Sequence, residues 1–251
     1  MEINVGTRKR TRSIEIDFEA IWNALLDLLF PPKCPFCGRL LSDSPVCDAC
    51  ADALPWTDDD RIPQSGAADA DSVPDNAADA LVCVAPLYYE GAVRNALLAF
   101  KFEGKEASGD SFGRLVAQCA SERLSGMFDT VTFVPISRER RRKRGYNQSQ
   151  RIAESACRLW GVRPEGLLVK TADNPPQSGI GGAAARRANV SGVYALAPGH
   201  SAVGRRVLLV DDIRTTGATL RECAKVLRDG GAASVCCVTV AEVRPRKDAQ
   251  S

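Results

Sequence analysis

The sequence contains a single histidine, His200, among 251 residues, and no apolar run approaches the about 20 residues that span a membrane. His200 lies in "APGHSAVG", where we expect a surface turn, so a histidine-based serine or cysteine triad cannot be built. The formal net charge of +2 is too small to indicate nucleic-acid binding by itself. The basic start, "MEINVGTRKRTRS", lacks the apolar core that follows it directly in a secretory signal. We therefore expect a cytoplasmic protein.

Cysteine, by contrast, is abundant, with ten residues. This is many for a cytoplasmic protein, because disulfides rarely persist in the cytoplasm. Six of them are scattered among apolar neighbours and are typical of small buried side chains. The other four form two Cys-x2-Cys pairs in "CPFCGRLLSDSPVCDAC", namely Cys34, Cys37, Cys47 and Cys50. Four thiolates complete a tetrahedral Zn²⁺ shell and leave no open position, which predicts a structural, zinc-ribbon-like module. A redox pair and an iron–sulfur cluster are the alternatives.

Composition divides the chain into five regions. Apolar residues spaced by three and four from Ile14 to Leu29 predict an amphipathic helix that stops at Pro31-Pro32. Its polar face is acidic, which favours packing on the main domain or a partner over an anionic membrane. The segment with seven aspartates is too polar to bury a core. We expect a disordered basic tail at 1–13, helix and cysteine module at 14–56, an acidic flexible linker at 57–80, the main domain at 81–243 and a disordered tail at 244–251.

The main domain alternates short β-rich runs with helical stretches. The runs are 81–89, 130–136, 166–170, 206–212 and 234–241, and they are apolar on both faces. This alternation predicts a parallel sheet covered by helices, in which ligands bind beyond the carboxyl ends of the strands. Leu220, Cys223, Ala224 and Leu227 follow the helical repeat before the glycine stop in "RDGG".

One strand ends in two acids, in "VLLVDDIRTTGATL". Asp211 and Asp212 fall at the carboxyl edge of the sheet, and a loop of small residues leads into a helix near Gly217. Backbone N–H groups at a helix N-terminus, helped by threonine hydroxyls, can hold a phosphate. The acids would repel that phosphate, so they suit another part of the ligand, such as ribose hydroxyls. A tight strand–helix turn with solvated acids is the alternative.

This stretch resembles the 5-phosphoribosyl-1-pyrophosphate (PRPP) motif of type I phosphoribosyltransferases. The resemblance implies that fold, with Asp211 and Asp212 on the ribose in the catalytic site and Mg²⁺ bound with PRPP. The phosphate would lie on Thr215, Thr216, Gly217, Ala218 and Thr219. It also implies that both acids are accessible and that the corner beside them is wide enough for an anion.

Further stretches are similar to the ComF family, phosphoribosyltransferase-like proteins named for competence, the uptake of DNA. They are "LLAFKFEGK" (97–105), "FVPISRERRRKRGYNQSQRIA" (133–153) and "QSGIGGAAARRANVSGVYAL" (177–196), together with the four-cysteine module. The resemblance covers most of residues 30–243. It implies partners in DNA uptake or recombination, such as a competence helicase.

The basic run after the strand at 130–136 corresponds to the pyrophosphate-binding loop of these transferases. The candidates are Ser137, Arg138, Arg141 and Arg144, and the sequence does not separate these arginines from Arg140, Arg142 and Lys143. A mobile lid would contain Gln177, Arg186, Arg187 and Asn189. A solvated charge run is one alternative, and a footprint for single-stranded DNA is another. Tyr146 is the one aromatic residue close to the run, so base stacking is poorly supported.

Together these features predict a protein that transfers or recognises a 5-phosphoribosyl group, with a nucleobase or an amine as the acceptor. The competing hypothesis is a non-catalytic adaptor or a PRPP-regulated binding protein of a DNA-uptake or recombination assembly. Fold alone does not decide between these.

Overall fold

The computed structural model describes residues 31–57, 81–171 and 192–244. The chain divides into two compact units, Met1–Pro32 and Lys33–Ser251, and all of the described helices and strands belong to the second. The expected N-terminal helix, both tails apart from Arg244, almost all of the acidic linker and the lid lie outside the described residues. Within the described ranges, no helix is long and apolar enough to cross a membrane.

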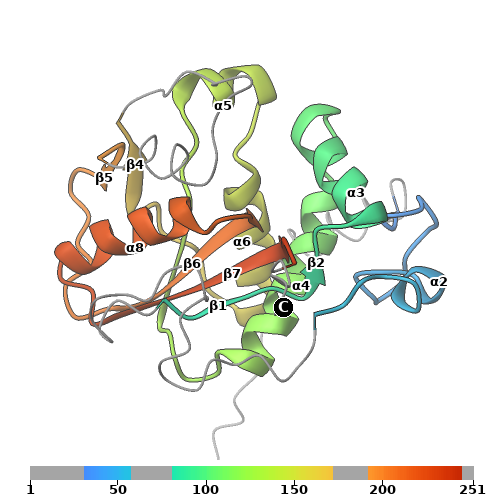
Figure 1. The fold of residues 1–251 in the computed structure, drawn as a ribbon, viewed down its shortest axis with the longest axis horizontal. Helices are drawn as coiled ribbons and strands as arrows, with labels where there is room; N and C mark the ends of the chain where they lie inside the picture. The colour runs from blue at the N-terminus through green and yellow to red at the C-terminus, as the bar shows by residue number, and fades with distance from the viewer. Residues whose placement is uncertain (1–30, 58–80, 172–191, 245–251) are drawn as a thin grey trace, which may run out of the picture. The chain divides into compact units, whose positions relative to one another are not determined.

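The centre of the domain is a parallel sheet of five strands, as expected (Figure 1). The strands are β1 (Cys83–Val84), β2 (Leu87–Tyr88), β3 (Thr130–Phe133), β6 (Arg206–Arg214) and β7 (Ser234–Glu242). Their order is β1-β7-β6-β3, with β2 also on β7, so that β6 is internal and β3 lies at an edge. Strand β6 runs two residues beyond the expected run because it stays paired with β7 up to Arg214 and Glu242.

Helices cover the sheet on both faces. On one face are α3 (Gly91–Phe102), α4 (Ser108–Arg123) and α6 (Gln148–Trp160), and on the other is α8 (Ala218–Asp229). Two further helices, α2 (Asp48–Ala51) in the cysteine module and α5 (Arg138–Arg144), have no buried residue. Alternate residues of β6 enter two separate cores, because successive side chains of a strand point to opposite faces. Leu208 and Val210 pack with α3, α4 and α6, whereas Val207 and Leu209 pack with α8. The predicted apolar stripe of α8 is buried.

One expected strand of the parallel sheet is elsewhere. Residues 168–170 form β4 (Leu168–Lys170), which pairs antiparallel with β5 (Tyr194–Leu196) in a separate two-stranded ribbon. The pattern at 166–170 is short and apolar, so it carries no information about its partner. Strand β5 was not expected at all. Its buried Tyr194 and neighbouring Val193 join the core under α8, which explains why the ribbon lies there.

The cysteine module packs into the same core as the main domain. Cys34, Val46 and Leu54 are buried in the cluster shared with α3 and α4. The ring of Phe36 meets that of Phe112 edge-on, with centroids 6.2 Å apart. Arg123 of α4 donates to the hydroxyl of Thr57 at 2.9 Å. The module therefore shares its hydrophobic support with the sheet.

Candidate phosphoribosyl site and zinc centre

Asp211 and Asp212 lie near the carboxyl end of β6, as the sequence predicts, and they sit in different surroundings. Asp211 Oδ1 accepts hydrogen bonds from Ser149 Oγ at 2.7 Å and from the backbone N–H of Asp212 at 2.9 Å. Burial and the neighbouring charge of Asp212 nevertheless raise the pKa of Asp211 to about 7, while Ser149 and Lys101 act in the opposite direction. At neutral pH this carboxyl group is therefore close to its titration point.

Asp212 is covered by a lysine from a distant segment. Lys101, in the last turn of α3, places its Nζ 2.9 Å from Asp212 Oδ2. Asp212 is consequently only 8% exposed, so the expectation that both acids are accessible is wrong for Asp212 in this structure. Lys101 lies in "LLAFKFEGK", but nothing in its local pattern shows that it reaches an acid 111 positions later. A ligand that uses Asp212 has to displace this ammonium group.

The loop after the acids ends in the expected helix start. Gly217 caps α8 with φ +69°, a left-handed conformation in which a side chain is strained. Thr216 Oγ1 accepts from the backbone N–H of Ala218 at 3.4 Å. Arg221 donates to the carbonyl of Thr216, and its Nη1 lies 3.1 Å from where a Cβ on Gly217 would be. The loop therefore carries a guanidinium group that the sequence analysis missed, although it sits one turn into α8.

Tyr194 is a second residue that sequence reasoning missed. It comes from β5, is buried, and packs in the same core as Leu220 and Cys223 of α8. Burial raises its pKa, so the hydroxyl keeps its proton at neutral pH. Lys170 Nζ lies 5.6 Å from the centre of the same ring. The ribbon β4–β5 therefore borders α8, and Thr215 is the exposed residue of the loop 215–219.

The basic run is a helix, α5, rather than the expected loop. Ser137 begins it by accepting a hydrogen bond from the Arg140 N–H at 3.3 Å, and Gly145 ends it in the left-handed conformation. Most of its cations lie in the last turn, where the helix dipole favours positive charge. The side chains of the predicted pyrophosphate residues therefore leave the helix in different directions.

Arg144 is the predicted arginine that faces the acids. Its Nη1 donates to Gln148 Oε1 at 2.9 Å, and its guanidinium carbon lies 4.9 Å from the centre of the Phe102 ring. Burial lowers the pKa of Arg144, and the charge of Asp212 acts against this shift. Gln148 is buried, and its Nε2 has no hydrogen-bond partner among the described residues. Arg144 thus brings positive charge to the acids without an ion pair.

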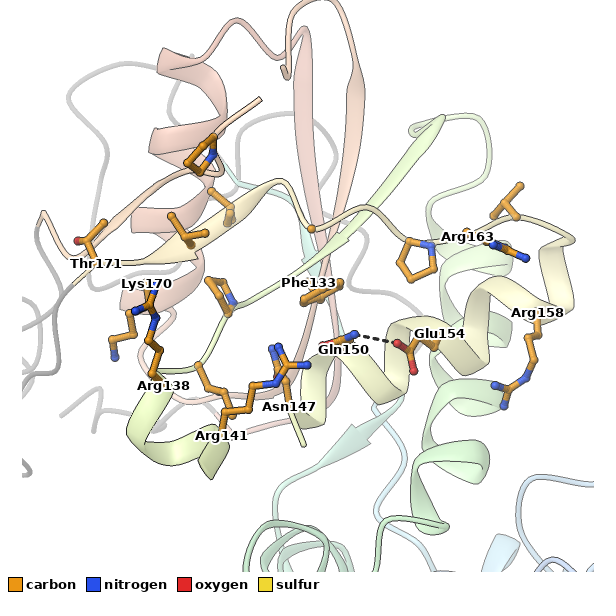
Figure 2. Close-up of a pocket in the computed structure, with 18 residues that line it drawn as sticks. Phe133, Arg138, Arg141, Asn147, Gln150, Glu154, Arg158, Arg163, Lys170 and Thr171 are labelled. Carbon is orange, nitrogen blue, oxygen red and sulfur yellow. Dashed lines mark hydrogen bonds between the residues drawn. The ribbon is translucent and has the colours of Figure 1, made fainter. Parts of the chain in front are cut away.

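Arg138 and Arg141 instead line a cavity of about 1120 Å³, which we call the lateral cavity (Figure 2). It runs beside the edge strand β3, between α5, α6 and β4, and neither Asp211 nor Asp212 lines it. The remaining predicted residues, in the lid, lie outside the described residues: Gln177, Arg186, Arg187 and Asn189. The structure therefore brings Arg144, the acids and the loop together and turns Arg138 and Arg141 to another face.

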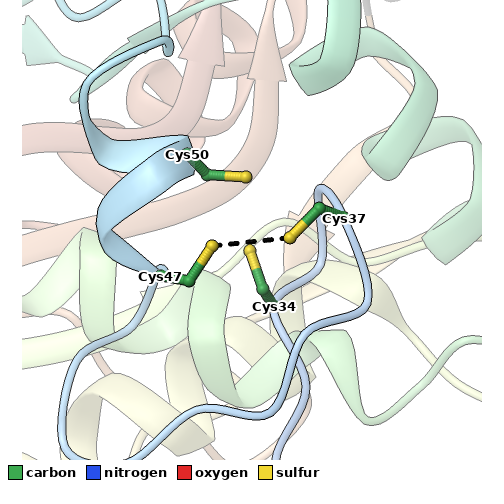
Figure 3. A group of neighbouring side chains, drawn as sticks. All are labelled: Cys34, Cys37, Cys47 and Cys50. Carbon is green, nitrogen blue, oxygen red and sulfur yellow. Dashed lines mark hydrogen bonds between the residues drawn. The ribbon is translucent and has the colours of Figure 1, made fainter.

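The four predicted cysteines converge (Figure 3). All four Sγ atoms lie within 4.8 Å of one another, and those of Cys37 and Cys47 are 3.4 Å apart. Zn–S bonds of about 2.3 Å in a tetrahedron place sulfur atoms about 3.8 Å apart, so the cluster fits a zinc ion. Turns that carry both Cys-x2-Cys pairs explain the convergence: Gly38 N donates to the Cys34 carbonyl, and Cys50 N donates to the Cys47 carbonyl. The group is a four-cysteine zinc-binding module.

Comparison with known families agrees with this architecture. Residues 110–250 match the phosphoribosyl transferase domain family, and residues 25–83 match the double zinc ribbon domain. Within 25–83 the sequence holds one four-cysteine cluster and, apart from it, only Cys83, so these residues supply a single such site. The fold and these matches define a phosphoribosyl transferase domain that carries a zinc ribbon.

Curated relatives narrow the family further. Competence protein F of Haemophilus influenzae is 35% identical over 41% of this chain and 45% of its own length. Competence protein ComFC of Bacillus subtilis is 29% identical over 61% of this chain and 60% of its own. DNA utilization protein YhgH of Escherichia coli K12 is 29% identical over 43% of this chain and 46% of its own length. The chain belongs to the phosphoribosyl transferase family. Its similarity to these competence and DNA utilization proteins supports a place among the ComF proteins. The chain spans about half the length of the curated relatives it matches.

Two solved structures are also similar. One is an allosteric regulatory enzyme of purine biosynthesis, at 25% identity and a TM-score of 0.34, covering 53% of this chain and 25% of that one. The other is a protein from Thermus thermophilus, at 18% identity and a TM-score of 0.33, covering 57% of this chain and 86% of that one.

Proposed function

We propose that the domain binds PRPP at the corner formed by Asp211, Asp212 and the loop 215–219, and transfers or recognises its 5-phosphoribosyl group. The observation that carries this proposal is the placement of two acids near the carboxyl end of an internal strand, which a short loop joins to a glycine-capped helix of twelve residues. Ligands of parallel α/β sheets bind at that edge. The match to the phosphoribosyl transferase family supports it.

Each group at the corner has a distinct task in this proposal. The carboxylates accept hydrogen bonds from the ribose hydroxyls, and Ser149 holds Asp211 in place for this. The N-terminus of α8 and the Arg221 guanidinium bind the 5-phosphate. Arg144 and Lys101 supply positive charge for the diphosphate. Arg138 and Arg141 lie at the lateral cavity instead. Lys101 leaves Asp212 when the sugar arrives.

Mg²⁺ fits the donor set, because Asp211 and Asp212 offer the hard carboxylate oxygens that this ion prefers. When bound with PRPP it neutralises part of the diphosphate charge. The chain itself supplies no nucleophile in this proposal. Its residues bind and orient the sugar, hold the leaving diphosphate among cations and keep the acceptor in line, the acceptor being a nucleobase or an amine.

The test is calorimetric titration with PRPP and Mg²⁺ of the wild type and of Asp211→Asn combined with Asp212→Asn. We expect the double variant to lose at least about 100-fold in PRPP affinity, because it removes two charged hydrogen-bond acceptors. Asp229→Asn is the matched control, since Asp229 is an exposed carboxylate at the far end of α8 that pairs with Lys225. Equal affinity in all three proteins would refute the proposed site.

The second candidate is a PRPP-regulated adaptor without turnover. It is favoured by the cover that Lys101 places over Asp212, because a binding protein can work from such a closed corner. The relatives are named for competence and DNA utilization rather than for a transferase activity. In this alternative the partners are a competence helicase, recombination proteins or single-stranded DNA.

Release of pyrophosphate from PRPP, followed with a panel of nucleobases and with ammonia, separates the two candidates. Turnover with one acceptor supports the transferase. PRPP binding without turnover on any acceptor supports the adaptor.

A further inference from the structure

The lateral cavity is distinct from the proposed PRPP corner. It lies along β3, the edge strand, and its walls come from α5, from α6 and from residues 162–171. Ser149 and Gln150 are neighbours on α6 that serve the two places separately. Ser149 bonds to Asp211, whereas Gln150 lines the cavity. A ligand in the cavity therefore meets different residues from a ligand at the acids.

Positive charge stands at both ends of this cavity. Figure 2 shows Arg138, Arg141 and Lys170 at one end and Arg158 and Arg163 at the other. Among the described residues that line the cavity, Glu154 is the one that carries a carboxylate. It already accepts a hydrogen bond from Gln150 at 2.9 Å and forms an ion pair with Arg151 at 3.2 Å. The cavity is therefore strongly cationic.

Several of these cations have no counter-charge within the described parts of the chain. Arg158 pairs with Asp110, and Lys170 lies over the ring of Tyr194. Arg138, Arg141 and Arg163 form no ion pair with any described residue, and all three are exposed. Among the described residues, the ion pair within α5 joins Lys143 to Glu139 and leaves the arginines of that helix out. Clustered like charges on so short a helix destabilise it, and an anionic ligand removes that repulsion.

The middle of the cavity has a different character. Between the charged ends lies the ring of Phe133, and beside it the hydrogen-bonded pair Gln150 and Glu154 (Figure 2). Pro135 and Pro164 also line the cavity. A ring and two prolines offer a flat apolar surface, and an amide next to a carboxylate offers both a donor and an acceptor. Such a wall can pack against a base and bond to its edge.

We propose that the lateral cavity binds a nucleoside phosphate, with phosphate groups at its cationic ends and the base against Phe133. A free nucleotide carries these phosphate and base groups, and so does one residue of a single nucleic-acid strand. The proposal is independent of PRPP binding, because it uses neither the acids nor the loop 215–219.

The probes are deoxyadenosine 3′,5′-bisphosphate and a strand of six deoxyadenylates, titrated calorimetrically at fixed salt into the full chain. We expect Arg163→Gln and Arg141→Gln, at opposite ends of the cavity, each to weaken binding of the bisphosphate about tenfold, the effect of one lost guanidinium–phosphate pair. Arg142→Gln is the matched control, because it removes the same charge from α5 at an exposed residue outside the cavity lining. It should change the affinity less than about twofold.

The outcomes divide clearly. The proposal is supported when the affinity for the bisphosphate falls in both Arg163→Gln and Arg141→Gln but is kept in Arg142→Gln. Tighter binding of the strand then assigns a strand as the source, and equal binding assigns a free nucleotide. Equal loss in Arg142→Gln, binding of the strand without the bisphosphate, or inorganic pyrophosphate binding as tightly as the bisphosphate would overturn it. Titration of Arg163→Gln with PRPP and Mg²⁺ tests the PRPP corner separately.

Discussion

The acid pair at the end of β6 should cost the protein stability at neutral pH. In the folded chain the pKa of Asp211 is raised to about 7 by burial and by Asp212, against an ordinary value of 3.8. Between these two values the folded state binds a proton that the unfolded state has released, so the free energy of unfolding falls as pH rises from about 4 to about 7. A shift of about three pH units corresponds to about 4 kcal/mol. Because neighbouring carboxyl groups take up and release protons as a pair, we expect about half of this cost to be recovered when Asp211 alone is replaced.

Asp211→Asn is the perturbation that isolates this cost. The asparagine oxygen can still accept from Ser149 and from the Asp212 N–H, and the side chain no longer titrates. Relative to the wild type, the variant should gain about 1–2 kcal/mol in unfolding free energy between about pH 5 and pH 8. Urea denaturation at four pH values, with zinc in the buffer, measures this difference, and protonation of the zinc thiolates cancels between the two proteins.

A difference that stays constant with pH, or one that shrinks as pH rises, would refute this reasoning. Lys101 provides an internal check, since its ammonium favours the ionised form of Asp211. Lys101→Met should therefore steepen the fall of stability with pH. Lys105→Met should not, because Lys105 is exposed and pairs with Glu103.

The remaining predictions concern packing and metal. Gly113→Ala should destabilise the protein by about 1–3 kcal/mol in chemical denaturation, because its Cβ would lie 2.3 Å from that of Ser155 on α6. Gly109→Ala, in the same helix with its nearest contacts at 3.4 Å, should be neutral or stabilising by up to about 1 kcal/mol. Cys47→Ser should abolish stoichiometric zinc in metal analysis and cost several kcal/mol. The thermal transition of the whole domain should fall with it, and an unchanged midpoint would show that the module does not support the core.

Local patterns in the sequence predicted the elements whose signal lies within one segment. Strands β6 and β7 are apolar on both faces, so the periodicity indicates a buried parallel sheet, and the paired spacing of Cys34 to Cys50 indicates one metal site. The glycine before α8 marks the start of that helix. These features depend on neighbours along the chain.

What the sequence did not reveal comes from contacts between distant segments. Lys101 reaches Asp212 from α3, and Tyr194 packs against α8 from a ribbon strand that pairs outside the main sheet. Nothing local distinguishes a lysine that covers an acid from one that faces water. The basic run was expected as one pyrophosphate loop, whereas a helix turns its side chains around an axis, which sends Arg144 and Arg141 to different faces.

The first turn of α6 is the physical boundary between the acids and the lateral cavity. Asn147 accepts from the Ser149 N–H at 3.1 Å and donates to the carbonyl of Val134 at 3.0 Å, which fixes the helix start to the end of β3. From that anchored turn Ser149 reaches Asp211 and Gln150 reaches the cavity. Because successive residues of a helix point about 100° apart, one rigid turn serves both places, and movement of α6 would displace a residue in each. The two proposed ligands would therefore meet a common structural element while sharing no side chain of that turn.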